Sequence, residues 1–178
     1  MRRRTIKKSD DETVNATSPE QIRSRTFRRA AKLLAAKPRS IAELSERLLE
    51  RRGVTDKIVD EIIERLKEYG YLDDERYALS YASLKVKQRP IGRRRLQQEL
   101  KTKQVPNAVA DEALNLVYAE TPEEELIDRA IEKRIRLRGS PKTRQDAKSL
   151  FDHLLRQGFA FELVSDKVRV LSRTDLDD

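Results

Sequence analysis

Apolar residues recur along most of the chain at spacings of three and four, the period of a helix with one buried face. Single glycines and prolines interrupt this pattern where helices are expected to end or begin. An all-α protein is therefore expected. The pattern predicts helices over residues 18–37, 40–53, 55–69, 74–88, 93–103, 107–119, 121–139, 140 to at least 155, and about 161–172, with Ser140-Pro141 introducing the eighth.

Several helix starts carry a capping box, in which a Ser or Thr and a Glu or Gln three residues later satisfy each other's backbone N–H groups. Ser18 with Gln21, and Ser40 with Glu43, fit this pattern. The segment Thr121-Pro122-Glu123-Glu124 is expected to open a helix in the same way, with proline at the first helical position. These signals predict short turns between the helices.

A short turn separates the third predicted helix from the fourth. Gly70 is expected to take the left-handed conformation that ends many helices, which lets Tyr71 fold back on Leu66. Asp73 is expected to cap the next helix, and Asp74 places negative charge in its first turn. The turn is therefore expected to be rigid.

One pattern of apolar positions occurs three times along the chain. Counted from Val54, Val105 and Phe159, apolar residues follow at offsets 4, 5, 8, 9 and 12, with one exception. Nearly equal separations indicate an array of small units, each of which mainly touches its neighbours. The residues that precede the three starting points are Gly53, Gln104 and Gly158.

The repetition predicts three tandem three-helix repeats that form a short curved solenoid. The expected bounds are 18–72, 73–120 and 121–173. A disordered basic tail is expected over residues 1–17 and a frayed acidic tail over 174–178. Leu49 and Leu84 are among the side chains expected to face inward.

Composition adds a charge bias to this picture. The chain has 39 Lys and Arg residues against 31 Asp and Glu, a net charge of +8. This balance favours a polyanionic partner, nucleic acid first, while solvated cations on outer helix faces are the alternative. No apolar run approaches the roughly 18 residues of a membrane span, and the N-terminus lacks a signal peptide. A cytoplasmic protein without membrane contact is expected.

The sequence offers little for catalysis. It has no cysteine, and His153 is the only histidine, which excludes Cys/His zinc sites and disulfides. No nucleophile or acid motif surrounds His153, so a partly buried structural role is expected. Asp73, Asp74 and Glu75 form the only dense carboxylate cluster, and helix capping explains it. We predict no enzyme, catalytic residue, metal site or cofactor.

Basic residues gather in two stretches, over residues 23–39 and 85–103. The second holds eight cations against Glu99 alone. Its Arg93, Arg94 and Arg95 open a helix, where each positive charge opposes the helix dipole at a cost of about 0.3–1 kcal/mol. An anionic partner would explain this placement, and pairing with carboxylates such as Glu99 is the alternative. The candidate contacts are Lys85, Lys87, Arg89, Arg93, Arg94, Arg95, Lys101 and Lys103.

Two segments resemble motifs of the bacterial RecX family of recombination regulators. They are Gly70-Tyr71-Leu72-Asp73-Asp74-Glu75-Arg76-Tyr77-Ala78 and Arg89-Pro90-Ile91-Gly92-Arg93-Arg94-Arg95-Leu96-Gln97-Gln98-Glu99-Leu100. The resemblance implies a cytoplasmic, non-enzymatic protein that lies along the groove of the RecA–DNA filament. It also implies modulation, with inhibition expected, of the recombinase, ATPase and coprotease activities of RecA, in DNA recombination, DNA repair and the SOS response.

The residues that match the first family motif are expected to be structural: Gly70, Leu72, Asp73, Asp74, Arg76 and Tyr77. Gln104 departs from the glycine that the family usually has there, which puts the local turn geometry in question. A monomer is expected. Two hypotheses stay open: a regulator that binds the filament, with DNA contacted directly or through it, and a general basic helical protein that competes for DNA.

Overall fold

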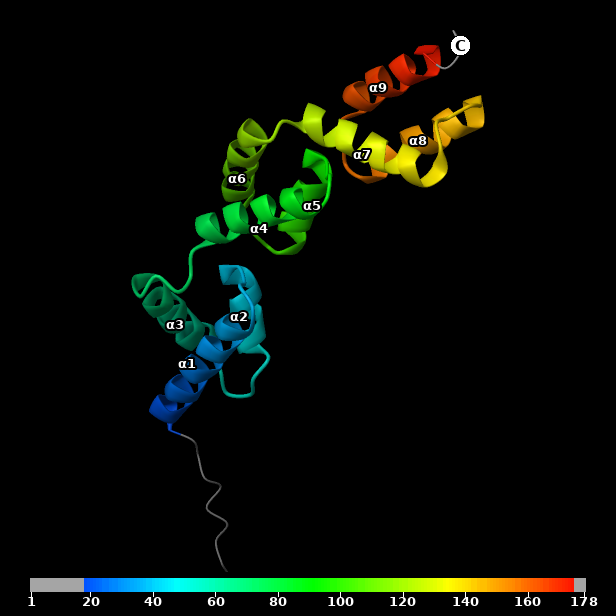
Figure 1. The fold of residues 1–178 in the computed structure, drawn as a ribbon. Helices are drawn as coiled ribbons and strands as arrows, with labels where there is room; N and C mark the ends of the chain where they lie inside the picture. Colours follow the sequence, from blue (N-terminus) through cyan, green and yellow to red (C-terminus); the bar gives the residue numbers. More distant parts are fainter. Residues whose placement is uncertain (1–17, 175–178) are drawn as a thin grey trace, which may run out of the picture.

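A computed structural model describes residues 18–174 of the chain, with side chains up to residue 171. Within this range the chain forms helices and no strands (Figure 1). The predicted tails lie outside the described residues, except that Thr174 ends the last helix. The helices are α1 (Pro19–Ala36), α2 (Ile41–Leu49), α3 (Asp56–Glu68), α4 (Asp74–Gln88), α5 (Arg93–Thr102), α6 (Asn107–Glu120), α7 (Glu123–Arg138), α8 (Arg144–Arg156) and α9 (Phe161–Thr174).

The helices pack in three consecutive groups, here called unit 1 (α1–α3), unit 2 (α4–α6) and unit 3 (α7–α9). Figure 1 shows the units following one another in a bent row, with unit 1 and unit 3 at opposite ends. The all-α repeat fold is therefore confirmed. An extended row leaves a large surface relative to its volume, which suits contact with a long partner.

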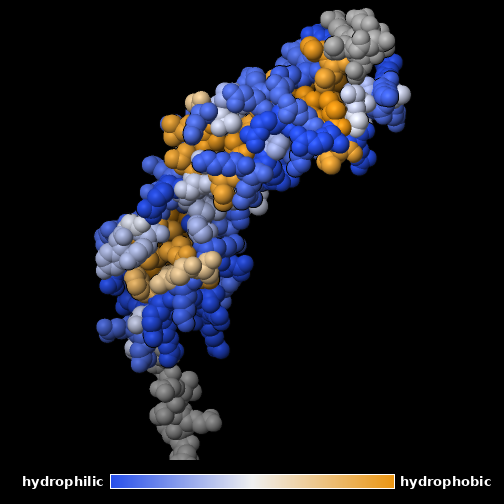
Figure 2. Space-filling model, in the orientation of Figure 1, coloured by the Kyte–Doolittle hydropathy of each residue, from blue (hydrophilic) through white to orange (hydrophobic). Residues whose placement is uncertain are grey.

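The apolar side chains of the described residues form two cores. The core of unit 1 contains Leu44, Leu48, Leu66 and the motif residue Leu72. A second core runs without a break through units 2 and 3, from Ala78 in α4 to Val168 in α9. Figure 2 shows hydrophobic residues at the surface in separate patches within a mostly hydrophilic exterior. Unit 1 is thus a separate packing body, whereas units 2 and 3 share one.

One helix start follows the prediction and another differs from it. The capping box of α1 forms as expected, with Gln21 N donating to Ser18 Oγ at 3.2 Å. In contrast, α8 begins at Arg144 rather than at Ser140-Pro141. The reason is a second box further along, in which Thr143 and Asp146 satisfy each other's backbone N–H groups.

The turn after α3 forms as predicted in its backbone and differs in one side chain. Gly70 has a φ of +68°, and Tyr71 N donates to Leu66 O at 2.9 Å. The Tyr71 side chain does not fold back on Leu66, because the residue is 67% exposed and its ring meets Tyr69 edge-on at 6.2 Å.

Two predictions of inward-facing leucines are wrong. Leu84 is 54% exposed because Ala82 and Val86 lie on the buried face of α4, and a residue midway between them points away. Leu49 is 40% exposed and is the last residue of α2, where the helix leaves the core. The register of the repeat itself is confirmed by three left-handed turn residues, Gly53 (φ +83°), Gln104 (φ +56°) and Gly158 (φ +91°).

Candidate interaction surface

The predicted contact residues lie on the end of α4, on both ends of α5 and on the segment between the two helices. Ile91 anchors this segment because it is fully buried and its carbonyl accepts a hydrogen bond from Tyr118 Oη at 2.9 Å. Burial raises the pKa of the Tyr118 phenol, so this donor stays protonated. The basic residues therefore stand on a fixed backbone.

Glu123 lies at the start of α5 although it belongs to unit 3. Its carboxylate accepts a hydrogen bond from Arg93 N at 2.9 Å. The prediction that Thr121 and Glu124 would cap this helix, with Pro122 at its first position, is wrong: α7 begins at Glu123, and no side chain caps it. A carboxylate placed here offsets the repulsion between the helix dipole and the three arginines.

Glu99 binds two of the predicted contact residues. Its carboxylate lies 2.7 Å from Arg89 Nη2 and 3.5 Å from Arg95 Nε, and accepts a hydrogen bond from Tyr81 Oη at 3.0 Å. Burial, together with the Glu99 hydrogen bond, raises the pKa of Tyr81 to about 12. Arg95 also donates to Arg156 O at 3.0 Å. Both arginines thus pair with Glu99 inside unit 2, as the pairing alternative anticipated, and Arg95 also joins unit 2 to unit 3.

Three more of the predicted residues have partners within the chain. Arg93 Nη2 donates to Asn115 Oδ1 at 2.6 Å, and Lys103 Nζ lies 3.1 Å from Glu43 Oε1. Lys85 Nζ stands 5.2 Å from the Tyr81 ring, within the range of a cation–π contact. Their charges are partly satisfied inside the molecule.

Lys87, Arg94 and Lys101 remain exposed, and their side chains have no hydrogen bond, ion pair or ring contact within residues 18–171. Arg94 and Lys101 are seven residues apart on α5, so they share one face at a separation of about 10 Å. Sequence alone could not single out these three, because Arg93 and Lys103 find their partners 22 and 60 residues away. We call Lys87, Arg94 and Lys101 the open cations of unit 2.

A second basic surface lies on unit 1. A groove of about 1140 Å³ runs between α1 and the turn that joins α2 to α3. The sequence pointed to the α1 residues of this groove and missed the two arginines of the turn, which lie outside the 23–39 stretch. The cations that line the groove are Arg25, Arg28, Arg29, Lys32, Arg51 and Arg52.

Polar side chains join unit 1 to unit 2. Asp74, the first residue of α4, accepts a hydrogen bond at 2.9 Å from Ile41 N at the start of α2. Ser40 Oγ donates to Lys103 O at 2.5 Å. Asp73 caps α4 within unit 2, where it accepts from Arg76 N at 2.9 Å. Burial raises the pKa of Asp74. The motif residue Asp74 thus caps a helix of the preceding unit as well as opening its own.

Backbone contacts join unit 2 to unit 3. Gly92 N donates to Gln157 O at 2.9 Å, and Arg94 N donates to Gly158 O at 3.1 Å. A Cβ atom on Gly92 would lie 2.2 Å from the carbonyl carbon of Gly158, closer than any real contact allows. The junction between units 2 and 3 therefore requires glycine at position 92.

Within the described part of the chain, no group of three or more His, Cys, Asp or Glu side chains could hold a metal ion. None of the described helices is long and apolar enough to cross a membrane.

Two family models match the chain, the first three-helix domain of RecX over residues 27–66 and the second over residues 73–114. The chain is 40% identical over 119 residues to a regulatory protein RecX of Treponema pallidum (strain Nichols). The matched region covers 66% of this chain and 71% of that protein. It is 31% identical over 153 residues to the regulatory protein RecX of Chlorobaculum tepidum, which spans 85% and 91%.

Solved structures share the fold. The crystal structure of RecX from Lactobacillus salivarius superposes with a TM-score of 0.75 at 21% identity and covers 85% of this chain and 97% of that one. A second crystal structure, of a regulatory protein RecX, gives a TM-score of 0.68 at 22% identity and covers 82% and 71%. The bent row of three-helix units is thus shared with these proteins.

Proposed function

Because the chain belongs to the RecX family, we propose that it is a non-enzymatic regulator that binds the RecA–DNA filament along its groove and modulates RecA. Its relatives are named regulatory proteins. The proposed effect is inhibition of recombinase, ATPase and coprotease activities, exerted in the cytoplasm by a monomer.

The observation that carries this proposal is the row of basic surfaces on an extended body. The open cations of unit 2 and the unit 1 groove stand on different units of one chain, so a repetitive partner can meet both at once. When one contact is made, the second forms within the same molecule, and the combined affinity exceeds that of either. A helical filament offers such repetition.

The predicted contact residues of unit 2 differ in whether they already have a partner inside the chain. Arg93, Arg95, Arg89 and Lys103 bind partners inside the chain, and freeing them for another partner would cost those interactions. The open cations carry no such cost. We therefore place the main filament contacts of unit 2 on Lys87, Arg94 and Lys101.

Charge reversal at Arg94 tests this assignment. Labelled chain is titrated with preformed RecA filaments on single-stranded DNA, and binding is followed by fluorescence anisotropy. We expect Arg94→Glu to weaken binding about tenfold or more. Lys57→Glu, an exposed position on α3 outside both basic surfaces, makes the same change in net charge and should bind nearly as the parent chain does. Equal binding by both variants would refute the assignment.

The alternative is a general DNA-binding protein that affects RecA only by competing for DNA. The basic surfaces would serve such a protein as well. Binding to DNA through six to ten phosphates should weaken by about 10³ to 10⁵ between 50 and 200 mM salt, whereas a groove contact between proteins responds less. A steep salt dependence that is the same for bare DNA and for filaments would favour this alternative.

A further inference from the structure

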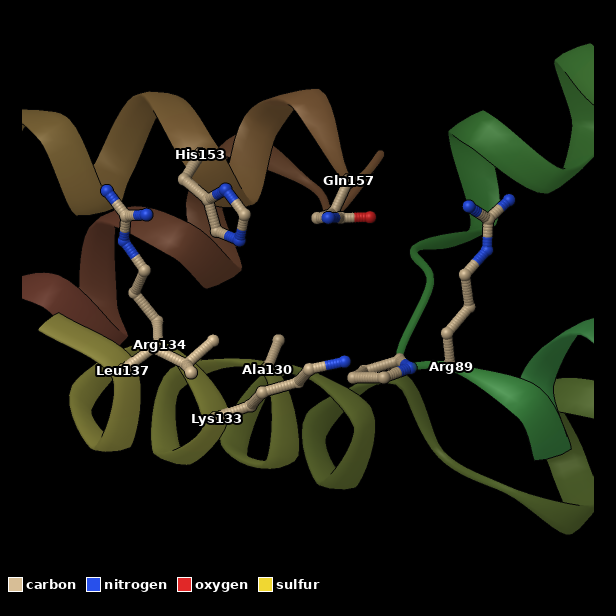
Figure 3. Close-up of a pocket in the computed structure, with 8 residues that line it drawn as sticks. Arg89, Ala130, Lys133, Arg134, Leu137, His153 and Gln157 are labelled. Atoms are coloured by element: carbon tan, nitrogen blue, oxygen red, sulfur yellow. The ribbon is translucent and has the colours of Figure 1, made fainter.

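A small pocket of about 230 Å³ lies where unit 2 meets unit 3. Figure 3 shows Ala130, Lys133, Arg134 and Leu137 rising from α7 on one side, and His153 and Gln157 entering from α8 on the other. Arg89 closes one end, together with Pro90. The pocket is thus built from three elements that the glycine junction holds in register.

The lining carries positive charge and no carboxylate. Lys133 has no hydrogen bond or ion pair within the described residues, and Arg134 donates to Ser149 Oγ at 3.2 Å. Arg89 contributes less, because Glu99 lies 2.7 Å from its guanidinium. Apolar walls lower the local dielectric, which strengthens the attraction of these cations for an anion.

His153 on α8 and Gln157 just after this helix face the pocket, and neither side chain has a hydrogen bond within the described residues. The side-chain carbonyl of Gln157 is buried and accepts no hydrogen bond within the described residues. Burial lowers the pKa of His153, and Arg134 and Arg138 from α7 and Arg156 from α8 lower it further. Asp152 precedes His153 on α8 and therefore points about 100° away from it. An anion in the pocket would reverse the field at the imidazole.

We propose that this pocket binds a phosphate group of a nucleic-acid backbone, with Lys133, Arg134 and His153 as hydrogen-bond donors. The volume is below the roughly 300–1,000 Å³ of sites for small organic ligands, so it suits one tetrahedral anion rather than a whole nucleotide. The pocket adjoins the segment that carries Arg89, so a nucleic-acid strand that passes the end of α4 can place one phosphate in it. Binding of a nucleic-acid phosphate in this pocket does not require binding to RecA.

The only histidine of the chain provides the readout, since its ring protons give a single set of NMR signals. The full chain is titrated with pH at low salt, with and without a ten-residue oligothymidylate. We expect the oligonucleotide to move the His153 midpoint upward by about one pH unit, because an anion within about 4–6 Å favours the imidazolium. Binding should accordingly tighten as the pH falls through the midpoint.

Variants and other anions decide whether the pocket causes the shift. Lys133→Gln and Arg134→Gln should each abolish most of it, while Lys148→Gln, an exposed cation on α8 outside the pocket, should leave it intact. Lys133 is itself exposed, so its replacement is compatible with folding. A shift that persists in Lys133→Gln and Arg134→Gln, or that sodium chloride reproduces, would overturn the proposal. A shift with inorganic phosphate but none with the oligonucleotide would overturn the assignment to a nucleic-acid backbone.

Discussion

The two junctions between units follow one plan but are held by different means. In each junction, an acidic residue that opens the later unit accepts a hydrogen bond from the backbone N–H that opens the second helix of the earlier unit. Asp74 accepts from Ile41 N, and Glu123 accepts from Arg93 N, both at 2.9 Å. In each, a turn of the later unit also meets the residue just before that second helix, Ser40 or Gly92.

The two junctions differ at the residue just before the second helix of the earlier unit, which is Ser40 in one and Gly92 in the other. Ser40 reaches Lys103 O with its hydroxyl, whereas Gly92 has no side chain and reaches Gln157 O with its backbone N–H. The second arrangement brings the units close enough to share one core, while unit 1 keeps a core of its own. Hydrogen bonds such as that of Ser40 contribute about 0.5–1.5 kcal/mol each to the free energy of unfolding. Separating two units that share a core also exposes apolar area to water, which adds a further cost. Unit 1 should therefore separate more readily than unit 3.

The largest expected effect breaks the tighter junction. Gly92→Val places side-chain atoms where the backbone of Gly158 lies, so we expect a loss of at least about 3 kcal/mol in the free energy of unfolding. Urea denaturation followed by circular dichroism measures it. Gly139→Ala serves as a control: its φ of +79° and ψ of 167° impose backbone strain but no atom lies within 4 Å, so about 1–3 kcal/mol is expected. A smaller loss for Gly92→Val than for this control would contradict the comparison.

Breaking the looser junction should have a smaller and more local effect. Asp74→Ala removes the acceptor for Ile41 N and should cost about 1–3 kcal/mol. Hydrogen exchange should show weaker protection in α2, with protection in α5 and α8 nearly unchanged. Asp74→Asn keeps an oxygen acceptor at the same place and should cost less. Equal loss of protection in all three units would mean that the chain unfolds as one body.

Gln104 combines a left-handed backbone with a contact across the looser junction, because its Nε2 donates to Glu46 Oε2 at 3.2 Å. It occupies the left-handed position that Gly158 holds at the tighter one. We expect Gln104→Gly to raise the free energy of unfolding by up to about 1 kcal/mol, since relief of left-handed strain exceeds the added freedom of the unfolded chain together with the loss of the exposed hydrogen bond to Glu46. Gln98→Gly, at an exposed position within α5, should instead lower it by about 1 kcal/mol. Destabilisation by both changes would show that position 104 is unstrained.

The smallest expected effect concerns pH. Burial is the largest cause of the raised pKa values of Asp74 and Glu123. A carboxyl with a raised native pKa binds protons more readily in the folded chain, so its contribution to stability grows as pH falls from the native pKa toward the ordinary one. Asp74→Asn should remove this contribution, a change of less than about 1 kcal/mol. Stability curves of the parent chain and the variant that run parallel over acidic pH would contradict this.

Much of the fold was predictable from the sequence because its signals are local. Helix period, the Ser18 box and the Gly70 turn each depend on residues within a few positions. The junction caps were not predictable in this way, since Asp74 and Glu123 act on helices that lie 33 and 30 residues earlier. The same holds for the basic cluster: the partners of Arg93 and Lys103 come from α6 and α2. Only the folded chain separates Lys87, Arg94 and Lys101 from the rest.

We propose that the chain acts on the RecA filament rather than on free DNA. Steady-state ATP hydrolysis by RecA on saturating single-stranded DNA, with this chain titrated far below the concentration of DNA sites, tests it most directly. The proposal predicts inhibition at these substoichiometric amounts, because a few bound molecules affect many RecA subunits. Inhibition that begins only when enough chain is present to coat the DNA would contradict the claim and leave competition for DNA as the explanation.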